Sequence, residues 1–129
     1  MLSEFNFWLA GAGLLTFLTF VLHTFVATKR VATPLLDTGS ALSSKSRFTN
    51  YYCWHAISFV LLLQTGCFFW SARIGNNPDL GYAATIMALG FLVWNVGMNI
   101  WLRPKTSAAP QWIFWLPISG LAITWIFTR

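Results

Sequence analysis

Four long stretches without a charged residue constrain this chain more than any other feature of its sequence. A helix of about 20 residues crosses a hydrocarbon core ~30 Å thick, and lipid offers backbone amides no water with which to bond. Each uncharged stretch is long enough for one crossing. The sequence therefore predicts four transmembrane helices, at residues 5–27, 50–72, 80–102 and 112–128.

The connections between these helices leave no room for a separate soluble domain. Hydrophobic residues make up 57% of the 129 residues and charged residues only 9%. The longest connection, residues 28–49, is short for an independent fold. We expect residues 1–129 to form a single integral membrane domain with an all-α fold, a four-transmembrane-helix up-down bundle.

The basic residues are concentrated in the first and third connections. Six of the eight lie there: Lys29, Arg30, Lys45, Arg47, Arg103 and Lys105. Under the positive-inside rule, this bias makes residues 28–49 and 103–109 cytoplasmic and puts both termini on the non-cytoplasmic side. The net charge of +5 is interpreted as a topology signal and a contact for anionic lipid head groups, and no nucleic-acid partner is expected.

Turn-forming residues refine the predicted ends of the helices. Pro34 is expected to end an extension of the first helix, because the residue before a proline disfavours helical backbone angles. Residues 37–40 have the composition of a turn, and residues 43–48 are interpreted as exposed first turns of the second helix. Pro117 is expected to interrupt the hydrogen bonding of the fourth helix.

Small and polar residues mark the helix faces predicted to pack inward, since they allow close approach and hydrogen bonding in lipid. Leu61 is expected to face lipid. The four predicted stripes, in chain order, are Ala12, Thr16, Thr19 and His23; Tyr51, His55, Ser58, Leu62 and Thr65; Gly81, Thr85, Ala88, Leu92, Asn95 and Asn99; and Gln111, Trp115, Ile118 and Ala122.

Two histidines and two asparagines are predicted to share one layer near the cytoplasmic face. His23, His55, Asn95 and Asn99 each lie a few residues from the predicted cytoplasmic end of their helix. Tyr51 lies one turn from His55 and could join them. Ionisable residues at membrane depth are functional-site hypotheses, so these residues form the candidate polar cluster.

Several kinds of chemistry are compatible with this cluster. The four side chains could simply hydrogen-bond the helices together. His23 and His55 could instead be the axial ligands of a b-type haem, provided that their helices are splayed or diagonal. A quinone or another lipid-like ligand bound against Tyr51, Trp54 and His55 is a further alternative. No metal site is expected beyond a haem iron, because cysteine and carboxylate ligands are absent at this depth, and no catalytic residue is predicted.

Two short segments resemble a known group of proteins. The run Tyr51-Tyr52-Cys53-Trp54-His55 and the run Pro110-Gln111-Trp112 are similar to segments of small, uncharacterised four-helix bacterial inner-membrane proteins. The resemblance implies a location in the bacterial inner membrane. It carries over no activity and no site residue.

The leading functional hypothesis is a non-enzymatic accessory or structural subunit of a larger membrane complex, whose partners are the lipid bilayer and other membrane-protein subunits. Its basis is the near absence of extramembrane sequence and of catalytic patterns. The alternative is a small haem- or quinone-associated electron-transfer subunit that uses His23 and His55.

Overall fold

The chain folds as an all-helical bundle of four helices. The computed structural model describes residues 5–39, 41–73, 78–102 and 111–128. In chain order, the elements are α1 (Phe7–Val21), the π-helix η1 (Leu22–Ala32), the 3₁₀ turn η2 (Thr33–Leu36), α2 (Ser44–Ala72), α3 (Pro78–Leu102) and α4 (Trp112–Phe127). The continuous helical run Phe7–Leu36, together with α2 and α3, is long and apolar enough to cross a membrane, whereas α4 is shorter.

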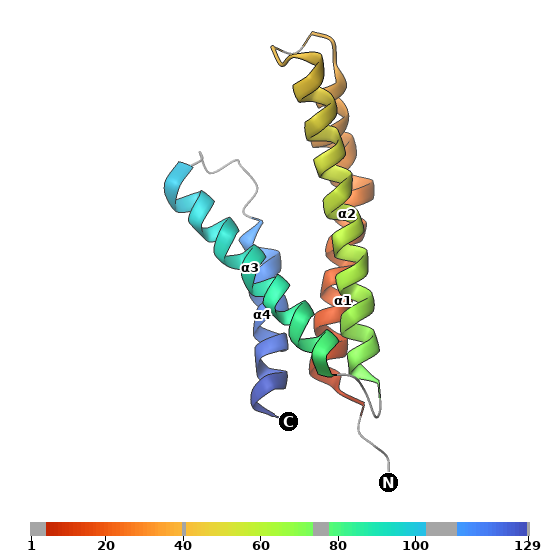
Figure 1. The fold of residues 1–129 in the computed structure, drawn as a ribbon, viewed down its shortest axis with the longest axis vertical. Coiled ribbons are helices and arrows are strands. Elements are labelled where there is room, and N and C mark those ends of the chain that lie inside the picture. The colour runs from red at the N-terminus through yellow and green to blue at the C-terminus, as the bar shows by residue number, and fades with distance from the viewer. Residues whose placement is uncertain (1–4, 40, 74–77, 103–110, 129) are drawn as a thin grey trace.

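The helices run alternately up and down, as predicted. In Figure 1, α1 begins and α4 ends at the same end of the bundle. Contacts follow a ring in which α1 packs on α2, α2 on α3, α3 on α4 and α4 on α1. Helices adjacent in the chain are therefore neighbours in space, the arrangement that short hairpin connections favour.

The bundle has four helices at one end and opens into a V at the other (Figure 1). α2 has 29 residues, about 43 Å at 1.5 Å per residue, whereas the 16 residues of α4 span only about 24 Å. The first turns of α2 pack against η1 and η2 and extend well beyond the other two helices. We call this two-helix extension, residues 22–36 and 44–56, the arm. Towards its C-terminal end, α3 leans away from the arm.

The core is built from small residues and a few large rings. Ala12 and Thr16 on α1 are fully buried, as predicted, and Gly13 packs on Phe68 of α2. Thr85 and Ala88 on α3, and Trp115, Ile118 and Ala122 on α4, are also buried, as their stripes predict: Thr85 1%, Ala88 0%, Trp115 5%, Ile118 0% and Ala122 0% exposed. The prediction that Gln111 faces inward is wrong, because Gln111 is exposed and precedes the first turn of α4. Small side chains let the helix axes approach closely, which strengthens packing between helices in lipid.

The predicted inward face of α2 is wrong at one step. Leu61 is 1% exposed and lies in the core, while Leu62 is 47% exposed. The buried face instead follows Ser58, Leu61, Thr65 and Phe68. Steps of three and four residues both keep a side chain on one face of a helix. The prediction used a step of four from Ser58 to Leu62, whereas the buried face continues by a step of three from Ser58 to Leu61.

Local side-chain hydrogen bonds mark several of the helix ends. Asn6 caps α1 by accepting from the Leu9 amide at 3.0 Å, and Ser43 caps α2 by accepting from the Ser46 amide at 3.2 Å. The predicted early start of α2 is thus confirmed. The prediction that Pro34 ends the first helical run is wrong, because Pro34 lies at the start of η2, where a missing amide is tolerated. The run ends at Asp37, whose carboxylate accepts from the Gly39 amide at 3.0 Å in the predicted turn.

Candidate functional site

A stacked pair of rings joins the two helices of the arm. The imidazole of His23, on η1, lies on the indole of Trp54, on α2, with ring centroids 4.0 Å apart and planes inclined by 16°. Nε2 of His23 also donates to the backbone carbonyl of Trp54 at 3.0 Å. His23 therefore holds Trp54 by its ring face and by one ring nitrogen at once.

Thr28 completes a closed set of contacts with this pair. Nε1 of Trp54 donates to the Thr28 hydroxyl at 2.8 Å, and that hydroxyl donates to the His23 carbonyl at 3.1 Å. We call His23, Thr28 and Trp54 the arm triad. Its three hydrogen bonds run from η1 to α2, from α2 back to η1, and within η1. Because hydrogen bonds in such a network strengthen one another, removing any one of the three groups should weaken the contacts between the other two.

The π-helical geometry of η1 is what puts His23 and Thr28 on the same side. Five residues along an α-helix correspond to a rotation of about 140° away from the starting face. A π-helix, with its i→i+5 hydrogen bonds, brings residue i+5 much closer to the face of residue i than an α-helix does. The bond from the Thr28 hydroxyl to the His23 carbonyl spans these five residues, and the same hydroxyl accepts from Trp54. The widened helix and the triad thus stabilise each other.

His55 and Tyr51 lie next to the triad on α2. Their rings meet edge to face with centroids 4.6 Å apart and planes inclined by 71°. His55 is the residue after Trp54, whose backbone carbonyl accepts the hydrogen bond from His23. The structure therefore brings His23, His55 and Tyr51 to one level of the arm. All three side chains are partly buried.

Asn95 and Asn99 are not brought to the histidines. The amide of Asn95 donates to the Phe91 carbonyl at 2.9 Å, and that of Asn99 donates to the Asn95 carbonyl at 2.8 Å. Both bonds stay within α3, which leans away from the arm at this end (Figure 1). Similar depth along two helices does not put two side chains side by side when the helices diverge.

The geometry of the arm bears on the haem hypothesis. η1 packs directly against α2, so the splayed or diagonal placement that a bis-histidine haem needs is not the arrangement of these helices. Iron at Nε2 of His23 would replace the bond to the Trp54 carbonyl. A macrocycle standing across the imidazole plane would also extend to the side on which the Trp54 indole lies. Haem binding would therefore require the triad to open.

Among the described residues, no group of three His, Cys, Asp or Glu side chains could hold a metal ion. A protein site for a divalent metal commonly uses three or four protein ligands. The polar side chains of the arm are mainly hydrogen-bonding groups, and the contacts they make are those of a structural junction.

A buried polar residue in the four-helix end was missed by the sequence reasoning. Gln64 of α2 is 0% exposed, and its Nε2 donates to the Ala84 carbonyl of α3 at 2.9 Å. Within the described part of the chain, its Oε1 and the Ser119 hydroxyl of α4 have no hydrogen-bond partner. The available signal was a glutamine in the middle of an apolar helix, where a polar side chain is expected to face protein rather than lipid.

The outward side of α3 carries a regular stripe that no other helix among the described residues covers. Ile86, Val93 and Ile100 are 69%, 70% and 69% exposed. At Gly90 and Gly97, between them, no atom of the described residues lies within 4 Å of the place of an added Cβ. The spacing of four and three residues is that of a helix-packing seam, with large residues alternating with gaps. We call these five residues the α3 stripe.

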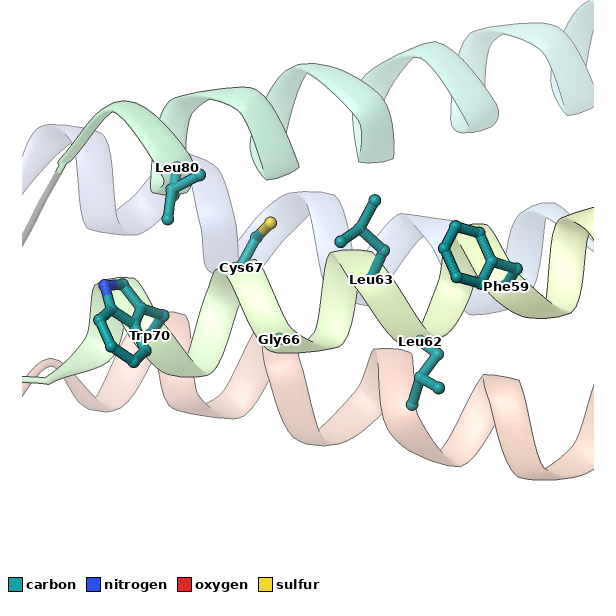
Figure 2. Close-up of a pocket in the computed structure, with 7 residues that line it drawn as sticks. All are labelled: Phe59, Leu62, Leu63, Gly66, Cys67, Trp70 and Leu80. Atoms are coloured by element: carbon teal, nitrogen blue, oxygen red, sulfur yellow. The ribbon is translucent and has the colours of Figure 1, made fainter.

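An apolar groove follows the outer side of α2. It has a volume of about 530 Å³ and is lined by Phe59, Leu62, Leu63, Gly66, Cys67, Trp70 and Leu80. Figure 2 shows Leu63 and Cys67 directed towards α3 and Leu80 directed back towards α2. The groove contains no charged side chain, so its walls suit an acyl chain or another apolar helix better than a polar ligand.

Comparison of the chain with family models, with curated proteins and with solved structures finds no match.

Proposed function

We propose that this chain is an integral membrane protein that acts through helix contacts as an accessory or structural subunit of a larger complex. The observation that carries the proposal is the α3 stripe. Between helices in lipid, association comes from close packing rather than from the hydrophobic effect. Gly90 and Gly97 leave gaps into which a neighbouring helix could insert side chains, and Val93 between them would be the matching knob.

The arm supports the same role because its polar groups are used in holding the arm together. The triad uses the His23 ring, the Trp54 indole and the Thr28 hydroxyl in contacts between or within η1 and α2. A rigid two-helix extension can present a fixed surface to a partner, since its own bonds restrict the motion of its helices.

The proposal includes a location and an orientation. The protein resides in the bacterial inner membrane, with residues 28–49 and 103–109 in the cytoplasm and both termini on the opposite side. Supporting this, the basic residues gather at the connections between α1 and α2 and between α3 and α4, as the positive-inside rule requires.

A photo-crosslinking residue placed in the stripe tests the accessory role. p-Benzoylphenylalanine at Val93 should give a discrete protein adduct in native membranes, because Val93 is the centre of the proposed contact. Leu116 of α4 is 55% exposed and is the matched control, which should give no protein adduct. Absence of a protein adduct at Val93, or equal adducts at the two positions, would overturn the proposal.

The second candidate function is electron transfer through a b-type haem or a bound quinone. The contact of His23 with Trp54, the residue before His55, favours it, while the occupied Nε2 of His23 counts against haem. An absorption spectrum of the protein purified in mild detergent separates the two functions. A Soret band lost in both His23→Ala and His55→Ala would replace the accessory role with electron transfer.

A further inference from the structure

The tip of the arm carries exposed positive charge directly above exposed aromatic rings. On α2, Lys45, Phe48 and Tyr52 follow one another at steps of three and four residues, which keeps them on one face of the helix. All three side chains are exposed, with Phe48 at 68% and Tyr52 at 74%. This face therefore changes from aromatic to cationic within two helical turns.

η1 repeats this change in the opposite chain direction. Phe25 and Val26 are 60% and 43% exposed, and the exposed Lys29 and Arg30 follow one turn later. Because η1 runs up the arm and α2 runs down it (Figure 1), both helices carry their cations nearer the tip and their apolar side chains below. Two independent segments thus mark the same boundary.

The length of α2 puts this boundary at the level of the lipid head groups. From Tyr52 to the end of α2 at Ala72, the helix rises about 30 Å, which equals the thickness of a hydrocarbon core. Lys45 lies about 10 Å farther along the helix, beyond the acyl region and within reach of phosphate groups, since a lysine stem can extend along the surface.

Arg47 does not belong to this cationic set. Its guanidinium donates to the Asp37 carbonyl at 2.8 Å and to the Ser44 hydroxyl at 3.1 Å. It therefore braces the turn that joins η2 to α2. In the stretch 28–51, Asp37 is the single acidic residue against four basic ones, so the tip keeps a net positive charge.

We propose that Lys29, Arg30 and Lys45 form a binding surface for the phosphate groups of anionic phospholipids, with Phe25, Phe48 and Tyr52 seated at the acyl–head group boundary. The aromatic and apolar side chains below the cations favour a lipid over a free anion, because a lipid carries acyl chains as well as a phosphate group. The inference rests on the membrane location of the chain and is independent of its accessory role.

The test compares two lipids of identical acyl chains on the full chain purified in neutral detergent. Native mass spectrometry should show tighter binding of phosphatidylglycerol than of phosphatidylcholine. Lys45→Gln should reduce that preference about fivefold, equivalent to about 1 kcal/mol for a cation near an anionic surface, and Lys29→Gln/Arg30→Gln/Lys45→Gln roughly a hundredfold. Arg73→Gln removes the same charge from the other end of α2 and should change the preference little.

Two measurements on the unmodified protein keep the inference testable if a variant folds poorly. Added salt should weaken binding of phosphatidylglycerol and leave that of phosphatidylcholine unchanged. Inorganic phosphate in equal molar amount should fail to displace the lipid. Equal binding of the two lipids, displacement by phosphate, or an equal loss in Arg73→Gln and Lys45→Gln would overturn the inference.

Discussion

A single methyl group added at Gly81 should destabilise the junction of α2, α3 and α4. A Cβ at this position would lie 2.7 Å from Cη2 of Trp125 and 3.3 Å from Cβ of Ser71. Carbon atoms pack best at about 3.5–4.0 Å, so the overlap with the indole is close to 1 Å. Trp125 is 5% exposed and lies against Tyr82 with ring centroids 5.0 Å apart, so its ring has little room to move.

Gly90→Ala is the matched control, because it makes the same chemical change in the same helix. Within the described part of the chain, no atom lies within 4 Å of the place of its added Cβ. Replacing glycine by alanine inside a helix gains roughly 0.5–1 kcal/mol in backbone entropy, and this gain is common to both variants. The difference between them therefore isolates the overpacking at Gly81, about 1–3 kcal/mol.

Unfolding of each variant by titrating mild detergent with sodium dodecyl sulfate, followed by far-ultraviolet circular dichroism, measures this difference. Gly81→Ala should unfold at a lower denaturant fraction than Gly90→Ala. Trp125→Phe added to Gly81→Ala should cost less than the sum of the two single changes, because the smaller ring frees space beside the new methyl group. Equal stability of the two alanine variants, or strict additivity with Trp125→Phe, would refute the packing at this junction.

Three further predictions concern the buried glutamine, the arm triad and the orientation of the chain. Gln64→Leu should change the free energy of unfolding by less than about 1 kcal/mol, because it loses one hydrogen bond worth about 0.6 kcal/mol but also removes an unpaired buried oxygen. Gln64→Ala leaves a cavity and should cost about 2 kcal/mol or more. Equal losses of stability for the two variants in the same titration would contradict this prediction. Trp54→Phe and Thr28→Val both break the bond between the indole and the hydroxyl, so the double variant should lose clearly less stability than the two single losses combined, and full additivity would count against the triad. In a background without the native cysteines, Thr128→Cys should react with an impermeant thiol reagent on intact cells and Thr38→Cys only after permeabilisation; the reverse pattern would invert the proposed orientation.

The sequence predicted the positions of the four helices well because the absence of charge is a strong and local signal, although α4 is shorter than a membrane-spanning helix. Asn50, the predicted start of the second helix, lies inside α2, and the predicted exposed turns from residue 43 onward belong to the same helix. Leu62 was predicted to face inward and Leu61 to face lipid, and the structure shows the reverse. Both residues are leucines in an apolar helix, so their chemical character does not distinguish the two faces. When lipid and core are both apolar, hydrophobic contrast no longer tells inside from outside.

The arrangement of the candidate site depended on tertiary structure that sequence periodicity does not contain. The π-helix η1 contains no glycine or proline within Leu22–Ala32, so its sequence gives no local sign of a departure from α-helical geometry. It accompanies hydrogen bonds to Trp54, a residue far away in the chain. Depth along a helix could be estimated by counting residues, and in the structure His23 bonds the carbonyl of Trp54, the residue before His55. It said nothing of the lateral divergence that separates α3 from the arm.

Purification of the tagged chain from native membranes in mild detergent tests the accessory role most directly. The unmodified chain should bring with it a stoichiometric membrane partner of different sequence and migrate well above the mass of a monomer. Gly90→Leu/Gly97→Leu should fill the gaps of the α3 stripe and release that partner. Gly120→Leu on α4, where an added Cβ also meets no atom of the described residues within 4 Å, should retain it. A lone monomer from unmodified membranes, or a partner retained by the double variant, would contradict the account.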